Sequence, residues 1–137
     1  MKHWLMKVEP SAYDIARLER DGSTSWEGVR NYMARNYMRE MKAGDKVLFY
    51  ASNAKPSGVT GLAEVSVEAR PEPGDPTWSM VDIKYVATFP EVVALETLKS
   101  TKGLEKMVVT QKGSRLSVQP VTKAEYDIVV KLGRKKK

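Results

Sequence analysis

A series of short strand-like segments, separated by turn-forming residues, limits what this chain can fold into. Residues 46–52 (KVLFYAS) are mostly apolar, as in a buried strand, and residues 78–88 (WSMVDIKYVAT) alternate between apolar and polar side chains, as in a half-buried strand. Between them, residues 71–76 (PEPGDP) hold three prolines and one glycine, a composition that predicts a loop. The chain is therefore expected to be rich in β-structure.

Further strands and short helices are expected on both sides of these segments. The other predicted strands are residues 3–8, 58–69, 107–110 and 115–118. The predicted helices are residues 12–18, with Ser11 as N-cap, and residues 30–41, 92–98 and 123–132. The last helix follows a capping-box pattern, Thr122 with Glu125. Five to six strands flanked by short helices predict an α+β fold, a small mixed β-barrel.

Length and composition indicate one domain and exclude several kinds of site. The 137 residues suit a single domain over residues 1–133, followed by a basic tail at 134–137. The tail supplies four of the 23 positive charges, so the rest of the chain is only mildly basic against 17 acidic residues. Cysteine is absent, which excludes disulfides and thiol nucleophiles. No apolar run fits a signal peptide or a membrane span, so a cytoplasmic protein is expected.

The sequence RNYM occurs twice, as residues 30–33 and 35–38. A spacing of five residues turns about 140° around an α-helix, so the two copies cannot face the same way. The helical phase predicts that Met33, Tyr37 and Met41 form the buried stripe of this helix.

The arginines of the same segment are expected to have different roles. Arg30 is predicted to project to the apolar side, where it either pairs with a carboxylate such as Glu9 or lines a pocket. Asn31, Arg35 and Arg39 are predicted on the opposite side. Arg35 and Arg39 are then either solvent-exposed or in contact with phosphates.

The sequence offers little for catalysis. His3 is the single histidine, and the chain has no metal-ligand cluster, no GxSxG motif and no glycine-rich phosphate loop. A site built on Lys7 with Ser52 has very weak support. No catalytic residue, metal or cofactor is therefore predicted.

Aromatic residues at element boundaries indicate binding instead. Trp26 and Trp78 both lie where a loop meets a regular element, beside small or polar residues. Together they could form a slot for a flat base, since stacking of a base on an aromatic ring contributes about 1–3 kcal/mol. Ser52 and Asn53, just after a buried strand, could read the edge of that base. Ordinary burial of the tryptophans and an ordinary turn at Ser52–Asn53 are the alternatives.

Several blocks of the sequence resemble the EVE-domain family. The matching blocks, in order, are residues 4–10 (WLMKVEP), 26–36 (WEGVRNYMARN), 50–53 (YASN), 58–61 (GVTG), 78–82 (WSMVD) and 115–121 (RLSVQPV). The resemblance covers nearly the whole chain and departs from family members mainly in the shorter segment 71–77.

The resemblance implies a PUA-like mixed β-barrel related to YTH and ASCH domains. It also implies recognition of a modified nucleobase, with modified cytosine in DNA as the leading ligand and DNA preferred over RNA. The residues carried over for the pocket are Trp26, Asn31, Ser52, Asn53 and Trp78. Lys7 and Glu9 are expected at the rim, with Arg30 close by.

The functional hypothesis from sequence is a non-enzymatic reader of a modified base. One base would be held between the two tryptophans, while cations hold the phosphates. The alternatives are an enzyme acting on a modified nucleotide or small ligand, an RNA-binding module, and a protein-interaction module that uses the Met-Tyr helix face. The oligomeric state is not predicted beyond a monomer as the default.

Overall fold

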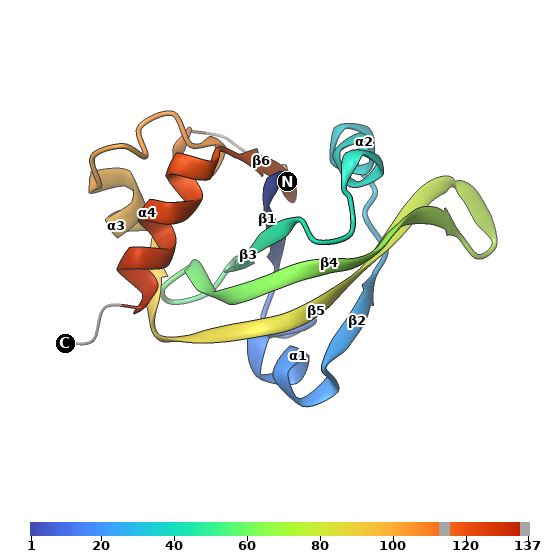
Figure 1. The fold of residues 1–137 in the computed structure, drawn as a ribbon, viewed down its shortest axis with the longest axis horizontal. Coiled ribbons are helices and arrows are strands. Elements are labelled where there is room, and N and C mark those ends of the chain that lie inside the picture. The colour runs from blue at the N-terminus through green and yellow to red at the C-terminus, as the bar shows by residue number, and fades with distance from the viewer. Residues whose placement is uncertain (113–115, 135–137) are drawn as a thin grey trace.

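A six-stranded mixed sheet runs through the molecule (Figure 1). The computed structural model describes residues 1–112 and 116–134, so most of the predicted tail, residues 135–137, lies outside it. The strands are β1 (His3–Val8), β2 (Ser23–Trp26), β3 (Lys46–Ala51), β4 (Gly58–Glu72), β5 (Asp75–Ala94) and β6 (Val118–Val121). Their order is β2-β5-β4-β3-β1-β6, with β1 and β3 parallel and the other pairs antiparallel. The predicted α+β class with five to six strands is confirmed, although in the described residues the sheet does not close into a barrel.

A long hairpin of β4 and β5 extends beyond the rest of the sheet (Figure 1). Its turn is formed by Pro73 and Gly74, and Gly74 has a φ of +88°, a conformation that favours glycine. The predicted loop at 71–76 is therefore wrong, because Pro71 and Pro76 lie within the strands. Prolines are tolerated at this tip because no further strand requires their missing N–H groups.

The helices are α1 (Ile15–Asp21), α2 (Tyr32–Glu40), α3 (Leu95–Ser100) and α4 (Lys123–Arg134), with a 3₁₀ turn at Val108–Thr110. The capping box of α4 is confirmed, since the backbone N–H of Glu125 donates to Thr122 Oγ1 at 3.1 Å and that of Thr122 donates to Glu125 Oε1 at 2.9 Å. The predicted cap of α1 at Ser11 is wrong. Asp14 caps this helix by accepting a hydrogen bond from the N–H of Arg17.

Three other predicted elements are corrected. Residues 92–94 continue β5, where Val93 pairs with Val59, because β-branched residues pack well in a strand. The predicted strand at residues 107–110 is a 3₁₀ turn at Val108–Thr110 instead. The last strand begins at Val118, and the start of the predicted strand at Arg115 lies outside the described residues. The short strand β2 was not predicted.

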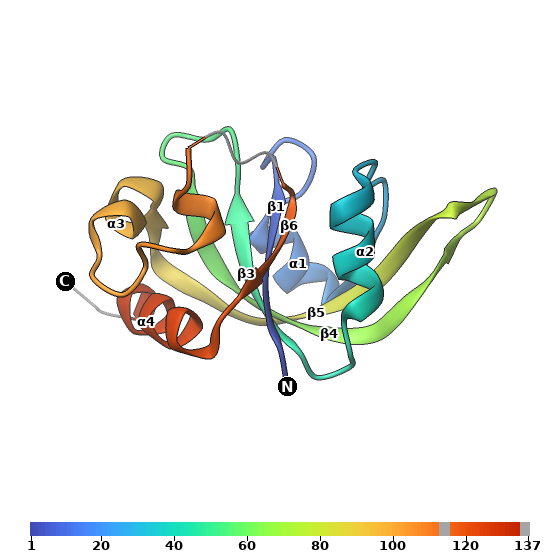
Figure 2. The same ribbon diagram turned by 90° about the horizontal axis from the view of Figure 1, so that it is seen from above.

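The sheet separates two apolar cores. Alternate residues of β1 and β3 point to opposite faces, so Trp4 and Phe49 join one core while Leu5 and Leu48 join the other. Helices α1 and α2 contribute to the first core, and α3 and α4 contribute to the second (Figure 2). Trp26 and Val29 belong to the first core.

Helix α2 begins two residues later than predicted, and the face that it buries differs from the predicted one. Asn31 is its N-cap, and Ala34, Met38 and Met41 form the buried stripe. Met33, predicted to be buried, is 58% exposed, and Tyr37 is half-buried. The two RNYM copies do face differently, since the methionine of the first is exposed and that of the second is buried.

Substitution of Gly58 by alanine is expected to destabilise the fold. A Cβ atom at this position would overlap the backbone carbonyl of Val93 on the paired strand. Because backbone cannot rotate away as a side chain can, we expect a loss of about 1–3 kcal/mol in the free energy of unfolding. Urea denaturation would measure it, with Ser66→Ala on the same strand as the control. An unchanged midpoint for Gly58→Ala would contradict the close approach of β4 and β5.

Candidate nucleobase-binding site

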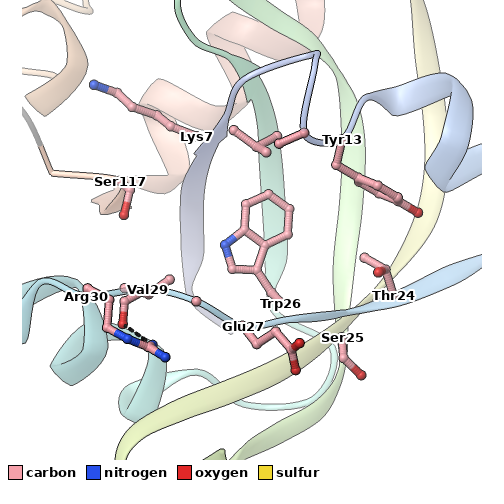
Figure 3. A pocket seen from close by; sticks show the side chains of 12 residues that line it. Lys7, Tyr13, Thr24, Ser25, Trp26, Glu27, Val29, Arg30 and Ser117 are labelled. Carbon is pink, nitrogen blue, oxygen red and sulfur yellow. Dashed lines mark hydrogen bonds between the residues drawn. The ribbon is translucent and has the colours of Figure 1, made fainter.

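A cavity of about 410 Å³ opens beside the end of β2, next to the first core (Figure 3). Its walls come from the end of β1 and the segment after it, from β2 and the segment leading to α2, and from the residue before β6. The lining residues are Lys7, Val8, Ala12, Tyr13, Thr24, Ser25, Trp26, Glu27, Gly28, Val29, Arg30 and Ser117. Three of them, Lys7, Trp26 and Arg30, were predicted as ligand-binding residues.

The indole of Trp26 stands in the middle of these residues (Figure 3). Trp26 ends β2, where it pairs with Val81 of β5, and its ring meets the ring of Phe49 edge-on at a centroid distance of 5.9 Å. This contact fixes the ring, which is only 8% exposed. Its Nε1–H has no hydrogen-bond partner among the described residues, and Figure 3 shows it on the side of Ser117 and Arg30. The ring therefore offers the cavity an aromatic face and a free donor.

Lys7 lines the same cavity from β1. Burial lowers the pKa of its ammonium group below the ordinary lysine value. Its Nζ lies 5.7 Å from the ring centroid of Tyr50, and it forms no ion pair with any carboxylate in the part of the chain that the structure describes. Lys7 also lines a second, open cavity of about 770 Å³ together with Lys99 and Lys112. It thus places an unpaired cation between the two cavities.

Arg30 lies at the rim of the cavity and is held by the hairpin. Its guanidinium donates two hydrogen bonds to Glu72, at 2.9 and 3.0 Å, and Glu72 also accepts from the backbone N–H of Gly28 at 3.0 Å. These hydrogen bonds raise the pKa of Arg30 and lower the pKa of Glu72. The predicted partner Glu9 is therefore wrong. Arg30 precedes α2 and is exposed, so it does not project to the apolar side.

Glu9, Ser52 and Asn53 form a separate group at one edge of the sheet. Since β1 and β3 are parallel, their ends lie side by side, and the backbone N–H of Ser52 donates to the carbonyl of Val8 at 3.0 Å. Asn53 donates from Nδ2 to Glu9 Oε1 at 3.2 Å. None of these three residues lines the cavity, although their neighbour Val8 does.

The predicted slot between Trp26 and Trp78 is not formed. Trp26 pairs with Val81 of β5, whereas Trp78 lies nearer the hairpin tip, where the β4–β5 pairing is irregular, and it does not line the cavity. Trp78 instead stacks on Tyr32, with a centroid distance of 5.0 Å and an angle of 25° between the rings. Asn31 does not line the cavity either, because its side-chain oxygen caps α2 by accepting from the N–H of Ala34 at 2.9 Å.

Arg35 and Arg39 extend from α2 toward the start of β5. Both donate to the backbone carbonyl of Thr77, at 3.0 and 3.2 Å, and Arg39 also donates to Ser79 Oγ at 2.9 Å. Neither forms an ion pair with a carboxylate among the described residues. Their charges are therefore not neutralised by a carboxylate of the described residues, and the predicted phosphate contact stays a prediction.

Several lining residues were not predicted, and their signals in the sequence are weak. Tyr13, Thr24 and Ser117 come from three distant segments that only the fold brings together. Within residues 1–112 and 116–134, no group of three or more His, Asp or Glu residues is arranged to hold a metal ion. In the same residues, no helix has the length and apolar character needed to cross a membrane.

Comparisons with known proteins give a consistent result. Residues 2–132 match the EVE domain. Human thymocyte nuclear protein 1 is 36% identical over 167 residues, covering 97% of this chain and 74% of the human protein. A crystal structure of human THYN1 protein in complex with DNA containing 5-methylcytosine has a TM-score of 0.90 at 34% identity and covers 100% of both chains. A crystal structure of a protein from Pseudomonas syringae has a TM-score of 0.91 at 38% identity and covers 95% of this chain and 98% of that one.

The YTH domain of the MRB1 protein of Zygosaccharomyces rouxii, solved with N6-methyladenosine RNA, has a TM-score of 0.63 at 16% identity and covers 99% of this chain and 88% of that one. This likeness confirms the fold relation that the sequence predicted. The expected cytoplasmic localisation is contradicted, because the relatives from human, mouse and chicken are named as nuclear proteins. The aligned span of the human relative is longer than this chain of 137 residues, so that relative carries residues there that this chain lacks.

Proposed function

Because the chain belongs to the EVE-domain family, we propose that it is a non-enzymatic module that binds a modified nucleobase in the cavity beside Trp26. Modified cytosine in DNA is the leading ligand. The human relative in complex with DNA containing 5-methylcytosine supports this choice. The observation that carries the proposal is the indole of Trp26, fixed by Phe49 and exposed to a cavity with one free N–H donor.

The chemistry of the cavity suits a methylated pyrimidine. The aromatic face of Trp26 can stack on the base, with a contribution of about 1–3 kcal/mol. The side chains of Val8, Ala12 and Val29 supply apolar surface against which a methyl group can pack. The Trp26 N–H can donate to a ring acceptor, while the hydroxyl of Ser117 can accept from an exocyclic amine.

The surrounding cations suit the phosphates on either side of an extruded base. Lys7 and Arg30 line the cavity itself, and Arg35 and Arg39 lie beyond Arg30 on α2. Lys7 has no carboxylate partner among the described residues, so a phosphate would relieve the penalty of burying its charge. Extrusion of a base from a duplex costs a few kcal/mol, so the protein should prefer single-stranded or mismatched DNA.

The predicted roles of Asn31, Ser52, Asn53 and Glu9 in ligand binding remain predictions. The Glu9–Asn53 hydrogen bond and Ser52 lie next to Val8, at the edge of the cavity. We propose that they contact the sugar or phosphate beside the bound base. The side-chain oxygen of Asn31 caps α2, so Asn31 would contact the nucleic-acid backbone through its NH₂ group.

A panel of short single-stranded oligonucleotides tests the proposal. Each carries one modified base or its unmodified counterpart, in DNA and in RNA, and binding is followed by tryptophan fluorescence. We expect at least one modified cytosine in DNA to bind about tenfold more tightly than its unmodified control, equivalent to about 1.4 kcal/mol. Equal affinity for every matched pair would refute the proposal. Recovery of the unchanged oligonucleotide after long incubation would separate a binding module from an enzyme.

A further inference from the structure

We infer that Tyr32 and Trp78 form a second stacking site, separate from the cavity, that takes an unmodified base adjacent to the captured one. This inference rests on the proposed function and assigns to Trp78 a role outside the cavity. Tyr32 and Trp78 form this platform together with Arg30 and Arg35, whose guanidinium groups lie against the two rings.

The geometry of the platform resembles a binding surface more than a core contact. The two rings are stacked at 5.0 Å and 25°, and Tyr32 is 61% exposed. The next residue, Met33, is 58% exposed, and among the large hydrophobic residues of the described chain only Met1 exceeds these two. An aromatic ring that is held in place but left open to solvent is ready to stack on a further flat group.

Two arginines lie over the rings of the platform. The guanidinium carbon of Arg30 lies 5.1 Å from the ring centroid of Trp78. That of Arg35 lies 4.9 Å from the centroid of Tyr32 and 5.9 Å from that of Trp78. These cation–π contacts add to the stacking that orients the rings, and Tyr32 is still 61% exposed with them in place.

The charge around the platform identifies the class of ligand. Arg35 and Arg39 have no carboxylate partner among the described residues, and their hydrogen bonds go to neutral groups, namely Asn36, Thr77 and Ser79. A guanidinium has five N–H donors, so each arginine retains donors that it does not use within the protein. Cations beside an open aromatic ring fit a nucleobase with its attached phosphate.

Arg30 connects the platform to the cavity. The same side chain lines the cavity at Trp26 and lies against the ring of Trp78. Only the segment from Val29 to Tyr32 separates the two sites along the chain. A strand with one base beside Trp26 can therefore place its next base on Tyr32 while the intervening phosphate lies near Arg30.

Substitution of Tyr32 by alanine tests the platform. The probes are the nucleoside 5-methyl-2′-deoxycytidine and short single-stranded DNA with one 5-methylcytosine or one cytosine. We expect Tyr32→Ala to weaken binding of both oligonucleotides about tenfold and equally, because the platform does not read the modification. Binding of the nucleoside, which reaches only the cavity, should not change.

Two further variants at Tyr32 test whether the aromatic ring itself is required for binding. Tyr32→Phe keeps the ring and should bind as the unchanged protein does, whereas Tyr32→Leu keeps apolar surface without a ring and should behave like Tyr32→Ala. Melting temperatures check that the exposed substitutions leave the fold intact.

The outcomes separate this inference from the proposed function. Unchanged oligonucleotide affinity in Tyr32→Ala would overturn the platform. So would a selective loss for the methylated oligonucleotide, because Tyr32 would then act in the cavity. If the unchanged protein shows no preference for a modified base, the proposed function fails, yet an equal loss for both oligonucleotides in Tyr32→Ala would still support the platform as a DNA-stacking site.

Discussion

Replacement of Trp26 by alanine should abolish the preference of the protein for a modified base. The indole is the aromatic face of the cavity, and removal of a stacking partner costs about 1–3 kcal/mol per base. The dissociation constant for the modified oligonucleotide should therefore rise roughly 5- to 150-fold. The constant for the unmodified control should rise less, because that oligonucleotide relies more on contacts with the phosphates. Titration of both oligonucleotides with both proteins gives the four constants needed.

A second variant separates binding from stability at this position. Trp26 packs against Phe49 and is largely buried, so its truncation to alanine should also lower the free energy of unfolding by about 3–5 kcal/mol. Trp26→Phe keeps an aromatic face and most of the packing but removes the free N–H donor. We expect it to fold normally, to retain oligonucleotide binding, and to lose about 1 kcal/mol of affinity for the modified base. A folded Trp26→Ala protein that still prefers the modified base would rule out this cavity as the site.

The sequence predicted secondary structure correctly where the pattern of a short segment is sufficient to identify the element. The alternation in residues 78–88 is visible in the segment itself, and the capping box at Thr122 depends on contacts within four residues; both are confirmed. Residues 92–94 were misassigned because apolar residues suit a short helix and a strand equally well. Pairing of Val93 with Val59 decides between them, and this contact is not visible in the local sequence.

The candidate site depends even more on contacts between distant segments, which the local sequence does not reveal. Trp26 was identified from its position at an element boundary, but its relation to Trp78 depends on the register of β2 with β5, which places Val81 opposite Trp26. From the sequence alone, two tryptophans at element boundaries suggest one slot, whereas in the structure Trp78 stacks on Tyr32 instead. Likewise, Arg30 was predicted either to pair with a carboxylate such as Glu9 or to line a pocket, but its actual partner, Glu72, comes from the tip of a hairpin that was expected to be a loop.

Substitution of Asp45 by alanine should cause a large loss of stability. Asp45 is 3% exposed and accepts hydrogen bonds from Trp4 Nε1 at 3.0 Å and from the backbone N–H groups of Lys2 and Lys42 at 3.1 and 3.0 Å. Its removal leaves the buried indole N–H without a partner, so we expect a loss of about 2–4 kcal/mol in urea denaturation at neutral pH. Asp127→Ala is the control, since its exposed pair with Lys123 should contribute less than about 0.5 kcal/mol.

The same carboxylate should make stability depend on pH. Burial acts to raise the pKa of Asp45, but the hydrogen bonds from Trp4 and the backbone outweigh it, so the pKa in the folded protein is lowered. A carboxyl group with a lowered pKa stabilises the fold fully above its ordinary pKa, about 3.9, and loses that contribution as the pH falls through the lower folded value. Asp45→Asn cannot ionise, so the difference in unfolding free energy between the unchanged protein and this variant should shrink as the pH falls below about 4. A difference that stays constant across this range would show that the charge of Asp45 does not stabilise the fold, and that only its shape is required beside Trp4.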